Sequence, residues 1–366
     1  MNKQDLYYRM ALSQVVGIGP KKHKILVGEV DETQQLFNAS LRFLKNIPGI
    51  SEANAHAIKD FSNFGLIEKE LNFCEKNNIQ ILCFDDELYP RKLSNCIDAP
   101  SLLFFKGNAN LNHPRSLSII GTRSFTEYGR KLCDDLIAEL KAYDVVIYSG
   151  LAYGIDIISH KACLKHEIST VGVVAHGLGS IYPPAHASTA KEMIEKGGLL
   201  SEYFSGEKAE KGNFPTRNRI VAGISDATIV IETDMKGGSM ITAEIAYSYN
   251  KDVFSFPGRI GDSKSAGCNF LIKSLKAQMA TCAEDIANSL GWNNLKKSKP
   301  PQRQLFIELN PDEENIVTQL KEKELTHIDE IYTKTGLSSS QVASAMLSLE
   351  MQGIIKVQPG KLFSLL

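Results

Sequence analysis

The spacing of hydrophobic residues divides the chain into four parts. Up to about residue 75, apolar positions recur at helical spacing between glycine-containing turns, which predicts a small helical domain over 1–75. Over 76–290, short apolar runs alternate with amphipathic segments. Residues 291–311 are rich in Lys, Pro, Gln and Asn without periodicity, which is typical of a linker. Helical spacing returns over 312–366 and predicts a last folded domain.

The middle part predicts an α/β fold. Short buried strands separated by helices are typical of a mostly parallel sheet that is covered on both faces. The expected strands are 79–84, 101–105, 116–120, 145–148, 170–174, 199–201, 227–232 and 252–256. The expected helices between the later strands are 128–142, 156–166, 187–196, 216–224 and 241–250. Such sheets bind ligands at the carboxyl ends of their strands.

The last part predicts a winged helix, which is three short helices followed by a β-hairpin. The expected helices are 313–321, 327–333 and 338–352, and the hairpin strands are 354–357 and 362–364. Residues 338–349 would form the recognition helix, but they include no Lys or Arg. This composition favours docking to a protein over reading DNA bases.

Two turns near the N-terminus, 15–20 and 47–51, each precede a helix-like run. Two such units resemble tandem helix-hairpin-helix (SAM-like) modules, whose turns can offer backbone N–H groups to phosphate. His23 and Ser51 depart from that pattern. A packing domain and a DNA-binding domain therefore stay equally open as interpretations.

Composition limits the classes of function. The net charge is −1, so affinity for nucleic acid must come from a local patch and not from a global field. The seven cysteines form no CxxC pair, which predicts free thiols and no metal site. No apolar run approaches bilayer length and no signal segment opens the chain, so we expect a cytoplasmic protein without membrane contact.

The stretch 211–219 concentrates Lys211, Phe214, Arg217 and Arg219 in nine residues. Cations at this spacing can neutralise phosphates, and an aromatic between them can stack on a base, which is the chemistry of single-stranded nucleic-acid binding. Arg217 and Arg219 face different sides of a helix. We expect one to seat a phosphate and the other to pair with an acid such as Asp226 or Glu232.

Three glycine turns, 121–123, 149–156 and 236–239, predict anion seats at helix starts. The strand 116–120 ends in Gly121-Thr122-Arg123 just before a helix, and we favour a phosphate role for Arg123 over capping of a loop carbonyl. Gly238 and Ser239 follow Lys236 and Gly237 and also lead into a helix. This loop is not a Walker A motif, so nothing here supports ATP hydrolysis.

A third turn, 149–156, lacks the spacing of a dinucleotide fingerprint, which argues against NAD and leaves no cofactor to expect. We interpret Asp156 as a structural N-cap and His160 as a packed helix residue.

Taken together, these motifs resemble the DprA/Smf family of DNA-processing proteins. The resemblance also rests on 176–183, 201–203 and 256–258, and it covers 115–287 densely. It implies an extended Rossmann-like domain flanked by a helical N-terminal domain and a winged-helix C-terminal domain. It further implies a homodimer that binds single-stranded DNA and loads the RecA recombinase in natural transformation. The DNA site would comprise Gly121, Thr122, Arg123, Lys211, Phe214, Arg217, Asn218, Arg219, Gly238 and Ser239, with Phe214 stacking on a base. Two positions depart from the family pattern: Thr122 stands where serine is common, and Gly237 replaces a serine.

Two hypotheses follow from different classes of protein. The first is a DNA-binding mediator without catalysis. The second is a nucleotide-processing enzyme similar to phosphoribohydrolases, which would need an acid or base beside the anion seat, such as Glu232 or Glu244. Phe214 among cations has no role in the second mechanism.

Overall fold

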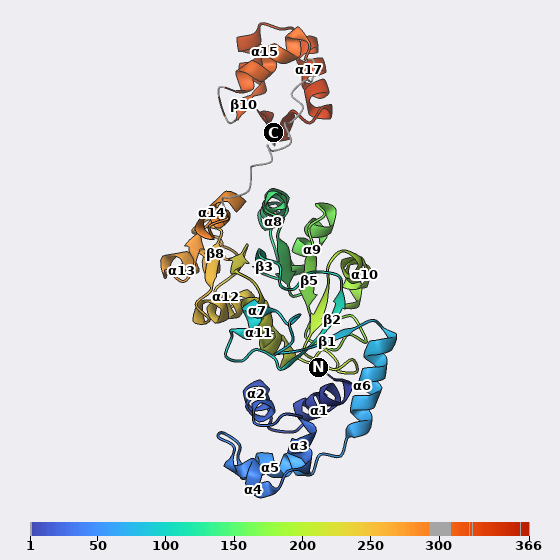
Figure 1. Ribbon diagram of the computed structural model, residues 1–366. Helices are drawn as coiled ribbons and strands as arrows, with labels where there is room; N and C mark the ends of the chain where they lie inside the picture. Colours follow the sequence, from blue (N-terminus) through green and yellow to red (C-terminus); the bar gives the residue numbers. More distant parts are fainter. Residues whose placement is uncertain (1, 293–308, 322, 324, 359, 366) are drawn as a thin grey trace. The chain divides into compact units, whose positions relative to one another are not determined.

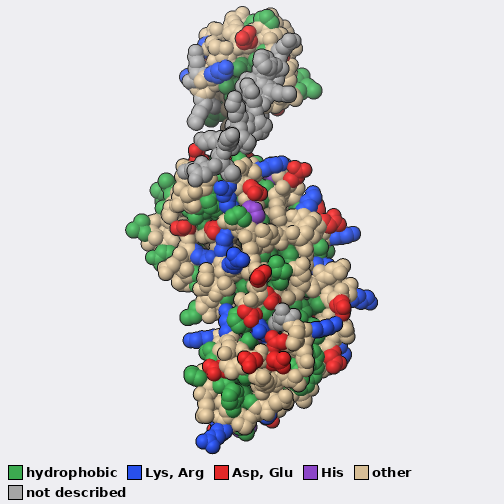
Figure 2. Space-filling model, viewed as in Figure 1, with side chains coloured by type: hydrophobic (Ala, Val, Ile, Leu, Met, Phe, Trp, Pro, Cys, Tyr) green, Lys and Arg blue, Asp and Glu red, His purple; other side chains and the backbone are tan. Residues whose placement is uncertain are grey.

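The structure is a computed structural model that describes residues 2–292, 309–321, 323, 325–358 and 360–365 (Figure 1). The chain forms two compact units, Met1–Lys296 and Lys297–Leu366. Most of the expected linker, 291–311, lies outside the described residues. The face seen in Figure 2 carries both basic and acidic side chains.

The first unit begins with six helices. The first five share a core of aliphatic side chains, and the sixth packs in a second core with the first helix and with the first two strands of the sheet. They are α1 (Lys3–Ser13), α2 (Pro20–Gly28), α3 (Gln34–Asn38), α4 (Leu41–Asn46), α5 (Glu52–Lys59) and α6 (Phe64–Lys76). The two residues that departed from the hairpin pattern have structural roles. His23 is buried with Nε2 2.9 Å from the Arg9 carbonyl oxygen, and Ser51 caps α5 in a capping box with Asn54.

A nine-stranded sheet follows, in the spatial order β1-β2-β6-β5-β4-β3-β7-β8-β9. From β6 to β9 all neighbours pair in parallel. Only the pairs β1–β2 and β2–β6 are antiparallel, so β2 alone runs opposite to the other strands. The mostly parallel sheet is therefore confirmed. Its strands are β1 (Gln80–Cys83), β2 (Leu102–Gly107), β3 (Ser116–Ile120), β4 (Val146–Ser149), β5 (Thr170–Val173), β6 (Gly198–Ser201), β7 (Ala227–Val230), β8 (Asp252–Ser255) and β9 (Gln278–Met279).

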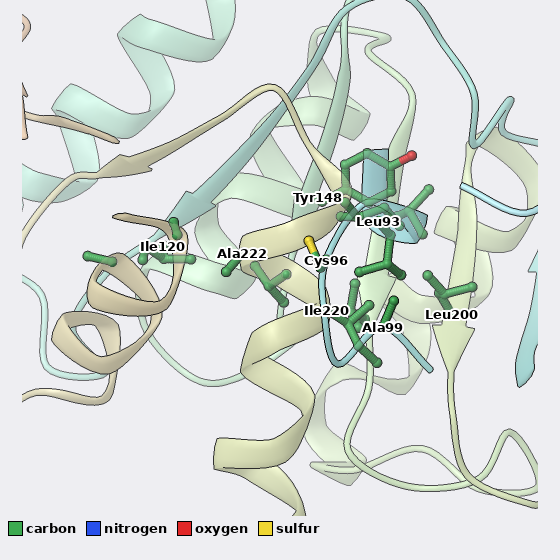
Figure 3. Close-up of a cluster of buried hydrophobic side chains, with 14 of the residues drawn as sticks. Leu93, Cys96, Ala99, Ile120, Tyr148, Leu200, Ile220 and Ala222 are labelled. Atoms are coloured by element: carbon green, nitrogen blue, oxygen red, sulfur yellow. The ribbon is translucent and has the colours of Figure 1, made fainter. Parts of the chain in front are cut away.

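Helices cover both faces of this sheet. Because successive side chains along a strand point to opposite faces, neighbouring residues of one strand enter different cores. Val146 and Tyr148 of β4 enter one core with α11 and α12, part of which Figure 3 shows, whereas Ile147 enters the opposite core with α8 and α9. The helices and 3-10 turns of this region are α7 (Arg91–Ser94), α8 (Glu127–Leu140), η1 (Lys141–Tyr143), α9 (Ile155–Lys165), η2 (Pro184–His186), α10 (Ala187–Lys196), α11 (Asn213–Ile224), α12 (Gly238–Ser248), α13 (Ala266–Lys273) and α14 (Ala283–Ser289).

The second unit has the expected three helices and hairpin around its own core. Its elements are α15 (Pro311–Leu320), β10 (Thr326–His327), α16 (Ile328–Thr335), α17 (Ser339–Met351), β11 (Ile355–Gln358) and β12 (Leu362–Leu365). The short strand β10 was not expected; it pairs with β12 and extends the hairpin to a three-stranded sheet. The winged-helix arrangement is confirmed.

Candidate functional site

The order of the strands defines where a ligand can enter. The chain builds the sheet from β3 toward β6 on one side, and then returns to place β7 and β8 on the other side of β3. The loops after β3 and β7 therefore leave in opposite directions and open a crevice between them. Ligands of parallel α/β sheets bind at such a switch point.

A cleft of about 710 Å³ lies at this edge of the sheet. All of the ten expected site residues except Arg219 line it. Arg123 and Lys211, which come from segments far apart in the sequence, thus share one cleft, as a common phosphate site requires.

The turn after β3 presents an exposed arginine. The Thr122 N–H donates to the Glu232 carbonyl oxygen (2.7 Å), which ties the turn to the end of β7. The Arg123 side chain is exposed, and its guanidinium lies over the Phe214 ring at 5.8 Å. Cation and aromatic ring are therefore adjacent, although they are 91 positions apart in the sequence.

The expected anion seat at the start of α8 is wrong. The Glu232 carboxylate occupies that place, where it accepts from the Thr126 N–H (2.9 Å) and from the Thr126 hydroxyl. Thr126 in turn caps the helix by accepting from the Gly129 N–H. Because this buried carboxylate already uses the helix terminus, Arg123 rather than the helix start would hold a phosphate here.

The start of α11 brings a second cation and the aromatic residue to the cleft. Lys211 is exposed and Phe214 is half-buried. The helix begins at Asn213, three residues before the expected position, because proline lacks only an N–H that the first turn leaves unpaired and so is tolerated there. Phe214 therefore projects from a helix and not from a flexible loop.

Arg217 supports the cleft from beneath. Its side chain is 4% exposed and donates to the carbonyl oxygens of Gly150 and Val173, at the ends of β4 and β5. Burial lowers the pKa of Arg217, while the neighbouring Asp156 carboxylate opposes this shift. Asn218 accepts from the Arg217 Nε (3.3 Å) and lines the cleft. Arg217 thus holds two loops in place through carbonyl groups.

Asp156 is not the N-cap that we expected. Gly154 occupies the N-cap position, and Asp156 lies in the first turn of α9. Burial raises its pKa, and Arg217 pulls in the opposite direction. Asp156 therefore balances a buried cation. His160 is packed as expected: it is fully buried with Nδ1 2.7 Å from the Thr170 hydroxyl.

Arg219 points away from the cleft and forms an ion pair with Glu202. The expected acidic partners are wrong, because both are already engaged. Asp226 accepts from Lys92 (2.7 Å) and Glu232 accepts from Thr126.

The loop after β7 supplies helix amides and a further lysine. Gly238 and Ser239 open α12, three residues before the expected start, and the first amides of a helix lack intrahelical partners. The Ser239 hydroxyl donates to Thr233 (2.7 Å), so only its backbone faces the cleft as a donor. A Cβ at Gly237 would lie 2.7 Å from the Thr233 hydroxyl, which explains the absence of a larger side chain there.

Lys236 is the residue that the sequence reasoning left out of the site. It is exposed and lines the cleft beside Gly237 and Gly238. Its position directly before the two glycines was the available signal. The cleft therefore has three exposed cations, Arg123, Lys211 and Lys236, against the two carboxylates Asp156 and Asp234, the latter 3.7 Å from Lys264.

The described part of the chain also bears on metal binding and on membrane insertion. No group of three or more His, Cys, Asp or Glu residues there could hold a metal ion. None of the described helices combines the length and the apolar character needed to cross a bilayer.

A Rossmann-like sheet with a cation-lined cleft at its switch point, joined to a winged helix, defines the class of this molecule. The family model "DNA recombination-mediator protein A" matches residues 80–291, and the "DprA winged helix domain" matches 298–361. The chain belongs to the DprA/Smf family of DNA-processing proteins.

Individual relatives agree with this assignment. The Protein Smf of Synechocystis is 30% identical over 98% of both chains. DNA processing protein A of Streptococcus pneumoniae superposes with a TM-score of 0.67 at 32% identity, over 78% of this chain and 98% of that one. A structure of the Helicobacter pylori protein, which describes its single-stranded DNA binding mode, matches with a TM-score of 0.53 at 33% identity, over 58% of this chain and 95% of that one.

Proposed function

We propose that this protein binds single-stranded DNA in the cleft between the loops after β3 and β7, without chemical conversion of the strand. The observation that carries the proposal is the grouping of Arg123, Lys211 and Phe214 on one cleft, with the guanidinium over the ring. Cations bind the phosphates of any sequence, and a ring accepts any base. The Helicobacter pylori relative, described as a single-stranded DNA binder, supports the same ligand here.

The half-buried position of Phe214 favours a single strand over a duplex. A ring at this depth can stack only on a base whose face is free, and in a duplex both faces of each base are covered by neighbours. The phosphate contacts alone would hold either form. The aromatic residue is therefore the source of the preference for single strands.

The two carboxylates that the enzyme hypothesis needs, Glu232 and Glu244, already have partners outside the cleft. Glu232 is buried at the start of α8, and Glu244 is exposed and pairs with Lys276 at 2.9 Å. Neither of them lines the cleft. Asp156 does line the cleft, but its carboxylate interacts with the positive charge of the buried Arg217. These engagements favour a binding site over a hydrolytic one.

The cellular role that we propose comes from the family. The protein would protect incoming single strands and load the RecA recombinase in natural transformation, as a homodimer in the cytoplasm. These assignments depend on the family membership, since the cleft itself carries information only about the ligand.

Fluorescence anisotropy with labelled oligonucleotides tests the ligand. We expect a single strand to bind more tightly than a duplex of equal length. Equal affinity for both would contradict the role of Phe214, and no binding to either would overturn the proposal. Incubation with nucleoside monophosphates, followed by chromatography for free base, tests the enzyme hypothesis, and turnover would reverse our preference.

A further inference from the structure

Two tyrosines line the same cleft beyond the residues considered so far. Tyr153 is 52% exposed and follows β4; Tyr182 is 49% exposed and follows β5. Both side chains leave half of their surface in water, so neither is ordinary core. Large exposed rings grouped on a concave surface mark a binding site more often than chance.

Each tyrosine is held in place by a buried histidine. The Tyr153 ring packs edge-on against His186 with a centroid distance of 4.8 Å, and His186 Nδ1 lies 2.9 Å from the Leu151 carbonyl oxygen. The backbone N–H of Tyr182 donates to His176 Nε2 (3.2 Å). Burial lowers the pKa of His176, which keeps its ring neutral and able to accept.

The Tyr182 ring lies next to the Phe214 ring. Their ring centroids are 6.1 Å apart and the planes are inclined by 58°. The Arg123 guanidinium lies over the same Phe214 ring, and Lys236 lines the cleft from the loop after β7. In the strand order β5-β4-β3-β7, Tyr182 follows β5 and Tyr153 follows β4, whereas Lys236 follows β7. The strands that carry the tyrosines are therefore three and two strand spacings, about 14 Å and about 10 Å, from the strand that carries Lys236.

We propose that Tyr153 and Tyr182 form a second base-stacking surface, so that the cleft holds an oligonucleotide and not a single nucleotide. This inference rests on the proposed function and states how far the DNA site extends along the strand. One base would stack at Phe214, with phosphates at Arg123, Lys211 and Lys236, and the bases further along the strand would stack on the tyrosines.

The test measures affinity for oligothymidylates of one to twelve nucleotides. For the wild type, affinity should rise with length until the tyrosines are occupied. Tyr153→Ala and Tyr182→Ala should each weaken binding of the longer strands by about 5- to 150-fold and leave the shortest binding strands unaffected. Tyr247→Ala is the matched control, since Tyr247 is 50% exposed and does not line the cleft.

Two further comparisons separate stacking from other contacts. Tyr153→Phe and Tyr182→Phe should bind like the wild type, because they keep the ring and lose only the hydroxyl. Longer strands with abasic sites should bind weakly to the wild type and no more weakly to the alanine variants.

Three results would overturn the inference. If the alanine variants bind strands of every length like the wild type, the tyrosines form no second stacking surface, and DNA binding in the cleft still stands. Phenylalanine variants as weak as the alanine variants would assign the contact to the hydroxyl. A wild type that binds no strand of any length would reject both the site and its extent.

Discussion

At the scale of single residues, burial decides what each cation does. Arg123, Arg217 and Arg219 carry the same guanidinium, yet Arg123 is exposed on the cleft, Arg217 holds carbonyl groups beneath it, and Arg219 pairs with Glu202. The sequence predicted that Arg217 and Arg219 differ and that one of them pairs with an acid, but not that Arg217 is buried beneath the cleft or that Glu202 is the acid. Burial depends on the packing of loops from β4, β5 and β6, which no local pattern encodes.

Phe214 should contribute through its ring alone. Phe214→Ala should weaken binding of single-stranded DNA by about 1–3 kcal/mol, and Phe214→Tyr should retain it. Anisotropy titrations measure the affinity, and circular dichroism checks that the variants fold. A folded Phe214→Ala protein with unchanged affinity would assign the ring to packing.

Glu202 should make stability depend on pH. Burial raises its pKa from 4.5 to about 7; Arg219 opposes the shift, and Glu207 and Asp98 add to it. The folded state therefore holds the proton more tightly than the unfolded state. The resulting stabilisation is complete below pH 4.5 and is lost as the pH rises through 7, with a span of at most about 3 kcal/mol.

Glu202→Gln removes this titration with little change in shape. Urea unfolding between pH 4.5 and 8 should show the free energy of unfolding of the wild type falling relative to the variant as the pH rises. Parallel curves for the two proteins would mean that the carboxylate titrates normally.

At the scale of elements, the period of the sequence predicted the strands β1 to β8 and the helices α8 to α12 and α15 to α17, but not the short edge strand β9 or the helices α7, α13 and α14. The expected strand 116–120 is β3 and the expected helix 187–196 is α10. The starts of α11 and α12 were each placed three residues late, because their first turns contain Pro215 and Gly238, which carry no helical signal. Those first turns are part of the cleft, so the site was less predictable than the scaffold.

Gly154 allows the loop after β4 to approach the Arg123 turn. Its φ is +87°, and an added Cβ would lie 2.1 Å from the Thr122 carbonyl oxygen and 2.5 Å from the Arg123 Cα. Gly154→Ala should therefore cost at least about 2 kcal/mol of stability and weaken DNA binding by displacing Arg123. Thermal unfolding and anisotropy measure the two effects.

Gly212→Ala is the matched control for this loss. Gly212 has a φ of −69°, and a Cβ there would meet no atom within 4 Å. It should leave stability unchanged or raise it by about 0.4–1 kcal/mol, because alanine restricts the unfolded chain. Equal losses in both variants would show that the crowding at Gly154 is relieved at little cost.

At the scale of the whole molecule, the net charge of −1 provides no general attraction for a polyanion. We expect the attraction to come from a local patch, formed by the three exposed cations of the cleft. This separation of local and global charge was predictable from the sequence, and the strand order explains why Lys236 lines the same cleft as Arg123 and Lys211.

The salt dependence of the DNA affinity should show how many of these cations contact phosphates. For three phosphate contacts, the logarithm of the association constant should fall with the logarithm of salt concentration with a slope of about −2. Arg123→Ala and Lys211→Ala should each reduce the steepness by about 0.7 and weaken binding of all sequences alike. Arg130→Ala serves as the control, since Arg130 is exposed but pairs with Glu127 away from the cleft.

A slope that exceeds the value for three contacts would place further phosphate contacts outside the cleft. If none of the cleft variants changes the slope, the cations of the cleft do not contact the phosphates of the bound DNA.

The return of the chain to place β7 beside β3 also affects how the protein is made. The two sides of the cleft come from 121–123 and 236–239, and they meet only after more than one hundred intervening residues have folded into strands and helices. A nascent chain on the ribosome that ends before β7 has Arg123 but lacks the opposite wall. We expect such a chain, which ends before Lys236, Gly238 and Ser239, to bind the ligand more weakly than the finished protein.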